Sequence, residues 1–595
     1  MRRLTLLCLA VLAAGFLFSL PSHDARYLNL AVTYELHEDG SWDMTVEQQA
    51  RLDTYFAVNR VLGETFIVYN PDFQKLEVLK SETTMADGRK VASPENAFNE
   101  VLPFAAHRFA DFAGLREMVV THVALERGAV VDLKYRIHTK AGFFPAFAGR
   151  ELLARDFPVD KYRLEINVPS GHALRYRVFG RQMDAQVSDT GAGKLYAFEL
   201  AALPPAAHEA LAPAGSEPAV VFSTAPDWPR ALALANDSAP LPPRLLERIE
   251  KLKAQFPARP DLLAELQKVV AGELQGCRLG NEATGWLPRP TERVFLSHYA
   301  TRLEKALLLR AMLSQAGIGA EVLAVANGNT FAADVPAWQQ IGEFWLKVNE
   351  GPHALYLDPW QVQQEFFPYR LLGRDAWNLQ RLVLEKLPAG DGTGSGVDVS
   401  GTVQLAADGA SGTLLVAARG VFNRYNDAAA DSGKFIAGLL KRLFPVDTVE
   451  VKKLLSLSRR EVRVEAAFSG KWLKENGRDF LSADAVRLPG LSENMAQPGQ
   501  RETPLALDAP FQASVNLELH PAAGLKLEYA APALKHKNEL GHYARSLNVE
   551  KNGVLRFSQS CAIAKDLIGP EKYPLLRELL LPYFAPDSWL VFKKE

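Results

Sequence analysis

The sequence predicts an α+β multidomain protein, with an N-terminal antiparallel β-sandwich, a central α+β core and a C-terminal β-rich domain. Three observations support this prediction. Alternating apolar runs separated by turn residues fill 26–202, apolar helical segments dominate 244–387, and β alternation returns in 397–595 after a Gly-rich linker at 388–396. The chain of 595 residues is long enough for about three or four domains.

Residues 1–22 have the pattern of a secretory signal peptide. Arg2 and Arg3 precede an apolar run at 4–20, and Pro21 follows it. We expect this segment to be cleaved; the alternative is an uncleaved N-terminal anchor whose residues 4–20 make the sole membrane contact. The protein is therefore expected to be exported, and to be periplasmic or associated with the cell envelope.

Composition and charge argue against several classes of function. The formal net charge of −2 gives no basic footprint for nucleic acid. Cys277 and Cys561, the cysteines outside the signal segment, fall in different predicted domains, so no disulfide framework is expected. The sequence contains no phosphate-binding loop, dinucleotide-binding fingerprint, zinc-ligand spacing or calcium loop, so we expect neither a cofactor nor a metal.

The region 26–202 is predicted to consist of short strands. Apolar residues alternate on both sides of Asp39-Gly40, which is typical of a hairpin turn, and the pattern recurs around Asp87-Gly88 and Arg127-Gly128. Repeated strands of this kind favour an antiparallel sandwich. The scattered histidines of the region are interpreted as surface or core residues: His107, His122 and His138.

A Pro- and Ala-rich connector at 203–243 is predicted to follow, with a short β-like insert at 220–222. Beyond it, apolar spacing predicts a helix over 245–252, and Pro260 opens a second helix that extends to about Val270. These helices begin the central core, which we place at 244–387.

The segment 297–325 predicts a buried helix followed by a strand. Thr301 and Glu304 form a capping box, so Arg302 occupies the first helical position. The helix body is apolar on most sides, and Gly317 ends it where a positive φ is needed. The strands that follow are predicted at 321–325, 343–348 and 354–358.

Five motifs of this region resemble the transglutaminase-like (papain-like cysteine) superfamily. They are the residues at 285–288 (GWLP), 290–294 (PTERV), 305–309 (KALLL), 316–318 (AGI) and 357–359 (LDP). More closely, nearly the whole mature chain resembles exported bacterial proteins in which that core lies between an N-terminal β domain of unknown function and a C-terminal β domain.

The resemblance also implies where a catalytic triad would lie. In that superfamily a cysteine at the helix N-terminus, a histidine on the next strand and an aspartate on the one after form the triad. Here Arg302 takes the cysteine position, and Phe344, or at most Glu343, takes the histidine position; Asp358 is retained. A guanidinium neither attacks acyl carbons nor accepts protons at ordinary pH, so no catalytic residue is expected in this degenerate triad.

Arg302 has two interpretations. The first is structural: Arg302 extends into solvent or forms an ion pair with Glu304, Glu343 or Asp358, and the ion pair is favoured because structural ion pairs are the commoner cause of an arginine near acids. The alternative is that Arg302 and the helix N–H groups form a site for a carboxylate or another anion.

A displaced triad is the remaining route to catalysis. Cys277 precedes the helix, His298 lies just ahead of it, and His353 comes five residues before Asp358. Nothing in the sequence places Cys277 at a helix N-terminus, where its thiol would be activated. We therefore treat this set as the weaker alternative, and we interpret Cys277 as a small buried residue.

The C-terminal region is predicted to be a second β-rich domain. Strands flank Asp408-Gly409, helices are predicted at 434–444 and 571–581, and an apolar stretch at 589–592 closes the chain. Aromatic and leucine clusters of this kind are typical of a core rather than a cofactor pocket.

The sequence therefore predicts a non-catalytic transglutaminase-like protein, a pseudoenzyme that binds or scaffolds a protein, a peptide or an envelope polymer. One alternative is an active acyltransferase or cysteine hydrolase with a displaced nucleophile such as Cys277. Another is a purely structural component of the cell envelope. Neither nucleic acid nor a small-molecule cofactor is expected as a partner.

Overall fold

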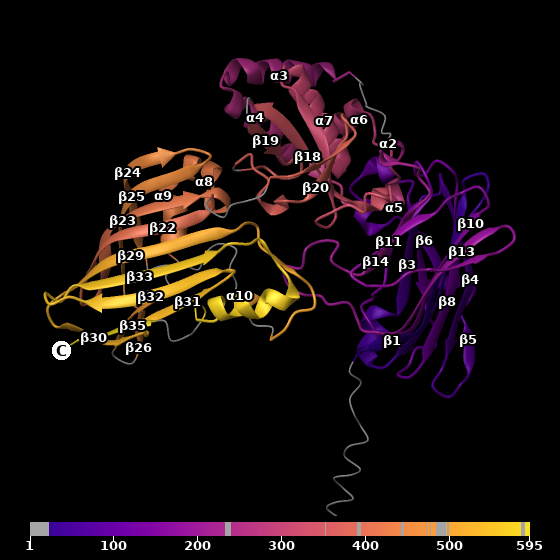
Figure 1. Ribbon diagram of the computed structural model, residues 1–595, viewed down its shortest axis with the longest axis horizontal. Coiled ribbons are helices and arrows are strands. Elements are labelled where there is room, and N and C mark those ends of the chain that lie inside the picture. The colour runs from indigo at the N-terminus through magenta and orange to yellow at the C-terminus, as the bar shows by residue number, and fades with distance from the viewer. Residues whose placement is uncertain are drawn as a thin grey trace, which may run out of the picture.

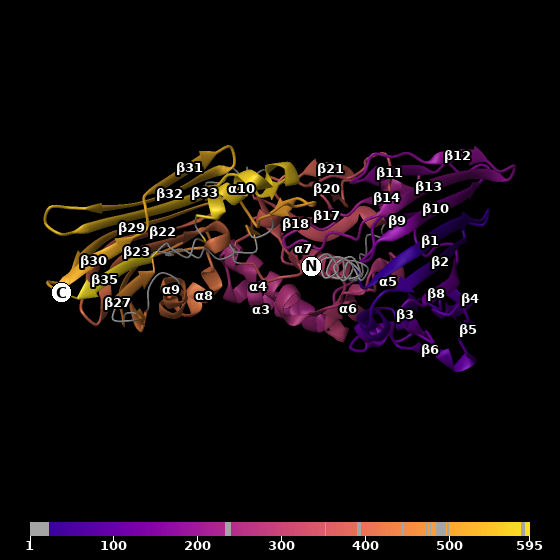
Figure 2. The same cartoon turned by 90° about the horizontal axis from the view of Figure 1, so that it is seen from below.

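The computed structural model describes residues 23–232, 240–350, 353–363, 365–388, 394–441, 446–471, 473–475, 478–482, 495–496, 499–582, 584 and 589–594. Two β-rich parts flank a smaller unit that carries most of the helices (Figure 1). Turned by 90°, the molecule has its two large sheets at opposite ends and α3, α4 and α7 between them (Figure 2). The predicted signal segment 1–22 lies outside the described residues. No helix within the described ranges is long and apolar enough to cross a bilayer.

The N-terminal part is built on an eight-stranded sheet. Its order is β12 (Gln186–Asp189), β13 (Gly193–Leu203), β10 (Val159–Pro169), β1 (Ala25–Leu36), β2 (Trp42–Leu52), β8 (Val130–Thr139), β4 (Gln74–Thr84) and β5 (Lys90–Ala92). The turn at 39–40 joins β1 to β2 in an antiparallel pair, as predicted. However, β1 pairs in parallel with β10, so the prediction of a wholly antiparallel sandwich is wrong at this position.

Two three-stranded sheets accompany this large sheet. One contains β3 (Glu64–Tyr69), β7 (Arg116–Thr121) and β6 (Phe98–Val101), and the other β11 (Arg175–Phe179), β14 (Ala219–Ser223) and β9 (Ala148–Leu152). Because β7 and β8 belong to different sheets, the residues at 127–128 do not form the predicted hairpin. The β-like insert of the predicted connector is β14, and all five of its residues are buried.

The central unit has a five-stranded sheet in the order β19 (His353–Leu357), β18 (Ile341–Glu350), β17 (Ala320–Ala326), β20 (Asp375–Asn378) and β21 (Val383–Lys386). Its helices are α2 (Trp228–Ala231), α3 (Pro243–Gln255), α4 (Arg259–Glu273), α5 (Asn281–Thr284), α6 (Thr291–Ser297) and α7 (Arg302–Gln315). A short parallel pair, β15 (Gln275–Gly276) and β16 (Tyr299–Ala300), precedes α7. Helix α7 packs against α4, β17 and β18, which explains its apolar body.

The C-terminal part also has an eight-stranded sheet. Its order is β24 (Thr448–Leu457), β25 (Glu461–Lys471), β23 (Gly409–Arg419), β22 (Gly396–Leu405), β29 (Phe511–Pro521), β33 (Leu555–Ile563), β32 (Gly541–Val549) and β31 (Leu534–Asn538). As in the N-terminal sheet, one pair is parallel, here β22 with β29. Gly396, the last residue of the predicted linker, already belongs to β22, whereas residues 389–393 lie outside the described residues.

Smaller elements complete this part. A four-stranded sheet contains β26 (Leu473–Glu475), β27 (Arg478–Ser482), β35 (Trp589–Lys594) and β30 (Leu525–Ala530), and β28 (Leu505–Ala506) pairs with β34 (Leu567–Ile568). The helices are α8 (Tyr425–Ala430), α9 (Ser432–Leu440) and α10 (Tyr573–Leu580). The predicted helix at 434–444 therefore starts two residues earlier, and part of its C-terminal end lies outside the described residues.

The N-terminal part and the central unit share one large cluster of buried side chains, and the C-terminal part has another. One cluster of buried side chains extends from Leu30 in the first strand to Leu379 beyond β20, and a separate cluster extends from Val397 to Phe592. The described residues of the segment 203–243 contribute side chains to the first of these clusters. The N-terminal part and the central unit are therefore packed together more intimately than a flexible connector would allow.

Candidate functional site

The N-terminus of α7 has the geometry that its sequence predicts. The Thr301 hydroxyl accepts a hydrogen bond from the Glu304 N–H at 3.4 Å, and the Glu304 carboxylate accepts one from the Thr301 N–H at 2.8 Å. Arg302 is the first residue of the helix. This capping box fixes the direction in which the Arg302 side chain leaves the helix.

Arg302 rests on an aromatic ring. Its Cζ lies 4.7 Å from the centroid of the Trp360 ring, a cation–π contact. The predicted ion pairs are absent from the described part of the chain, because the three carboxylates expected to receive Arg302 bind other arginines. Glu304 binds Arg289, whereas Glu343 and Asp358 both bind Arg370.

Trp360 is held tightly beside α7. A methyl group at Gly276 would lie 2.5 Å from Trp360 Cη2, so glycine is required there for the ring to fit. The backbone N–H of Trp360 donates to Asp358 Oδ1 at 2.8 Å, and the side-chain amide of Gln267 donates to the backbone carbonyl oxygen of Asp358 at 2.8 Å. The loop after β19 is therefore fixed both by its own turn and by α4.

Asp358, which the resemblance aligns with the catalytic aspartate, forms an ionic cluster with Arg370 and Glu343. Arg370 donates to Asp358 Oδ2 at 2.8 Å and to Glu343 Oε1 at 3.0 Å. Burial raises the pKa of the Asp358 carboxyl, and Arg370 opposes this shift. In a working triad this carboxylate would orient an imidazole, whereas here a guanidinium occupies it.

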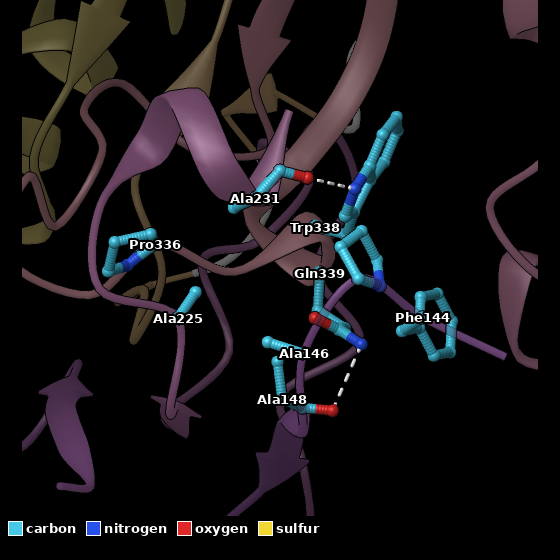
Figure 3. A pocket seen from close by; sticks show the side chains of 9 residues that line it. Phe144, Ala146, Ala148, Ala225, Ala231, Pro336, Trp338 and Gln339 are labelled. Carbon is cyan, nitrogen blue, oxygen red and sulfur yellow. Dashed lines mark hydrogen bonds between the residues drawn. The ribbon is translucent and has the colours of Figure 1, made fainter. Parts of the chain in front are cut away.

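Phe344, which the resemblance aligns with the histidine position, lies in the core. Phe344 is 7% exposed, and its ring centroid lies 6.1 Å from that of Trp338. Figure 3 shows Trp338 beside a small cavity of ≈ 10 Å³ between the central unit and the N-terminal part. There, Trp338 Nε1 donates to the Ala231 carbonyl oxygen at 2.6 Å, and Gln339 Nε2 donates to that of Ala148 at 3.2 Å.

Lys305 lies behind Arg302, one turn into the helix. It is 1% exposed, and its Nζ lies 5.1 Å from the Trp360 ring centroid and 3.4 Å from the Ala271 carbonyl oxygen. Burial lowers the pKa of this ammonium to about 8, and the negative charge of Asp358 opposes the shift. Two cations therefore contact one indole ring.

Cys277 and His298, the two members of the displaced triad whose side chains the structure describes, lie in different surroundings. Cys277 is 2% exposed, packs with Phe109 and Tyr299, and has its pKa raised to about 11 by burial. His298 is exposed at the end of α6, with φ 57° and its ring 6.3 Å from that of Phe295. His353 is the first residue of β19, and its side chain lies outside what the structure describes. The structure thus gives Cys277 no activating environment.

A second arginine, Arg289, anchors the same helix end. Its guanidinium donates two hydrogen bonds of 2.9 Å to the Glu304 carboxylate and also binds Asp111 of the N-terminal part. Its Cζ lies 4.4 Å from the ring centroid of Tyr299. Burial lowers the pKa of Arg289, but Glu304 and Asp111 more than offset this, so the guanidinium stays charged.

Sequence reasoning missed Trp360, Arg370, Gln267 and Arg289. Trp360 follows Asp358 by two residues and could have been noted from that proximity. Arg370 lies in a short 3₁₀ turn, Tyr369–Leu371, that no periodicity marks. Gln267 and Arg289 have partners far away in the sequence, so their roles became visible with the fold.

Two family models match parts of the chain, and both describe domains of unknown function. DUF3857 matches residues 38–207, and DUF3858 matches residues 484–586. The candidate site lies between these two stretches. No curated protein matches the chain.

Among solved structures, the chain is similar to that of a "putative protease" from Parabacteroides distasonis. The two share 23% sequence identity, and the match covers 96% of this chain and 99% of that one with a TM-score of 0.72. At this identity the likeness shows a common fold across all three parts.

Proposed function

We propose that the chain is a non-catalytic transglutaminase-like protein that binds a partner protein, peptide or envelope polymer through an acidic group. One observation carries this proposal. At the position that the resemblance gives to the nucleophile, Arg302 stacks on Trp360 and forms no ion pair among the described residues. The pattern of residues 1–22 supports an exported protein, and residues 4–20 would anchor it in the membrane if they are not cleaved.

The chemistry of the site argues against acyl transfer. Cysteine catalysis needs a thiolate next to a base, and both positions now carry groups that cannot perform those roles, a guanidinium and a buried phenyl ring. The raised pKa of Cys277 keeps its thiol protonated at neutral pH. A hydrolase with a displaced nucleophile therefore lacks support from the described residues.

The same geometry suits recognition of a carboxylate. Arg302 is half-buried, its planar side chain is held against an indole, and it lies at the positive end of the helix macrodipole. A guanidinium binds a carboxylate with two parallel hydrogen bonds, which adds geometric selectivity. Glu304 and Asp358 do not compete for it, because Arg289 and Arg370 neutralise them. An acidic peptide or polymer is the class of partner that fits.

An activity assay tests the non-catalytic part of the proposal. Hydrolysis of unfolded protein substrates and incorporation of an amine probe should stay at background for both the wild type and Cys277→Ala. Turnover that the wild type shows and Cys277→Ala lacks would instead establish an enzyme with a displaced nucleophile.

A binding assay tests the role of Arg302. Retention of the full chain on immobilised poly-L-glutamate, with poly-L-glutamine as the neutral comparison, should fall about tenfold in Arg302→Ala, the loss of one charge-assisted pair. Arg310→Ala, on the same helix, is the matched control and should bind like the wild type. Equal retention of both variants would remove Arg302 from the binding site.

A further inference from the structure

Two histidines and an aspartate meet on the N-terminal sheet, far from α7 in the chain. His37 follows β1, Asp43 is the second residue of β2, and His138 is the penultimate residue of β8. One ligand atom of each lies within 4.8 Å of the other two. Asp43 Oδ2 is 3.2 Å from His37 Nε2, and Asp43 Oδ1 is 2.8 Å from His138 Nδ1.

The backbone holds these three residues in register. Asp43 is paired with His138 across β2 and β8, and with Glu35 across β1 and β2. The turn that contains His37 is closed by its N–H, which donates to the Ser41 carbonyl oxygen at 2.9 Å. The cluster therefore rests on paired strands and a tight hairpin, a rigid support of the kind that metal sites require.

We propose that His37, Asp43 and His138 bind a divalent transition-metal ion, with Zn²⁺ as the best fit. Two imidazoles and one carboxylate are ligands that Zn²⁺ prefers, and three protein ligands leave a fourth position open. Ligands of a tetrahedral zinc ion lie about 3.3 Å apart. Each imidazole lies near that distance from one oxygen of Asp43, at 2.8 Å from Oδ1 and 3.2 Å from Oδ2. The ligand atoms of the three residues all lie within 4.8 Å of one another, so the ion would draw the two imidazoles together.

A simple ion-pair cluster explains the arrangement less well. The nearby cations Lys75 and Arg136 both bind Glu77, at 2.8 Å and 2.6 Å, and leave Asp43 facing two imidazoles. Asp39 is engaged in the turn, where it accepts hydrogen bonds from the N–H and hydroxyl of Ser41. Both histidine side chains are partly exposed, His37 to 36% and His138 to 42%, so an ion can enter from solvent.

The sequence did not reveal this cluster. His138 was interpreted as one of several scattered histidines, and the spacing of 37, 43 and 138 matches no short metal motif. The pairing of β2 with β8 creates the proximity. The inference is independent of the proposed function, because neither Arg302 nor Trp360 takes part.

Titration calorimetry with Zn²⁺ on the full chain, purified without a histidine tag, tests the site. The wild type should bind one equivalent, and His37→Ala, His138→Ala and Asp43→Asn should each weaken binding about tenfold or more. His172→Ala, which removes an exposed histidine of the same part, should bind like the wild type.

Co²⁺ provides a second readout that depends on coordination geometry. Visible absorption typical of tetrahedral Co²⁺ should appear with the wild type and disappear with His138→Ala. The same loss is expected for His37→Gln, and a circular dichroism spectrum of that variant identical to that of the wild type would show that the loss is not caused by misfolding. The proposal is wrong if the wild type takes up neither ion, or if His138→Ala binds Zn²⁺ as tightly as His172→Ala.

Discussion

Arg289 and Arg302 lie at the same end of α7, yet the molecule uses them in opposite ways. Arg289 is 14% exposed and shares its charge between Glu304 and Asp111, which joins the central unit to the N-terminal part. Arg302 has an indole ring as its partner and no carboxylate among the described residues. An arginine whose charge is already matched has a structural role, whereas one held in place without a matching charge remains available to a ligand.

Arg289→Ala should have the largest effect of the variants that test this difference between the two arginines. The change leaves Glu304 buried without its cation, and such a loss costs roughly 3–5 kcal/mol in the free energy of unfolding. Chemical denaturation of the full chain, followed by tryptophan fluorescence, measures it.

Arg293→Ala is the matched control for that variant. Arg293 also binds Asp111 but is 55% exposed, so its removal should leave the free energy of unfolding nearly unchanged. Equal destabilisation by the two variants would show that the buried ion pairs of Arg289 stabilise the fold no more than the exposed ion pair of Arg293.

Lys305 is another cation of helix α7. It is buried like Arg289, but it has no hydrogen bond to a carboxylate among the residues that the structure describes. Burial lowers its pKa from 10.5 to about 8, so between these values the unfolded chain binds more protons and stability rises with pH. Lys305→Met should therefore be more stable than the wild type at pH 7, by roughly 1–2 kcal/mol, because the loss of the cation–π contact with Trp360 offsets part of the gain. This advantage should shrink as pH rises from 8 to 10.5.

Urea unfolding at several pH values between 7 and 10.5 measures that difference. Lys268→Met, on α4, serves as the control, because that side chain is 59% exposed and its removal should change the free energy of unfolding little. A stability difference between Lys305→Met and the wild type that stays constant with pH would contradict the role of the buried ammonium.

The parts of the site that the sequence predicts are those that depend on near neighbours. Thr301, Glu304 and Gly317 specify the start and end of α7 through hydrogen bonds and backbone angles within a few residues, and the structure confirms them. The ion pair expected for Arg302 was wrong, because its three candidate carboxylates are engaged by Arg289 and Arg370. Those competitors come from loops whose positions depend on tertiary packing.

The sheets show the same difference between features set by neighbouring residues and features set by tertiary packing. Asp39-Gly40 specifies a hairpin locally, whereas the turn at 127–128 joins strands of two different sheets that share the same sequence pattern. Parallel pairing of β1 with β10 leaves no local signal, because its partner comes much later in the chain. The cluster of His37, Asp43 and His138 also depends on strand pairing between residues far apart in the chain, since β8 brings His138 to Asp43.

The central place of β1 in its sheet has a consequence for the order of folding. Its hairpin with β2 can form as soon as residue 52 is available, but its other edge must wait for residues 159–169. Closing so long a loop is slow, so the seam between β1 and β10 should be among the last contacts to form. Until then the three strands on the β10 side of this seam and the five on the β1 side are separate half-sheets with open edges. The β22–β29 seam imposes the same delay at the other end of the molecule.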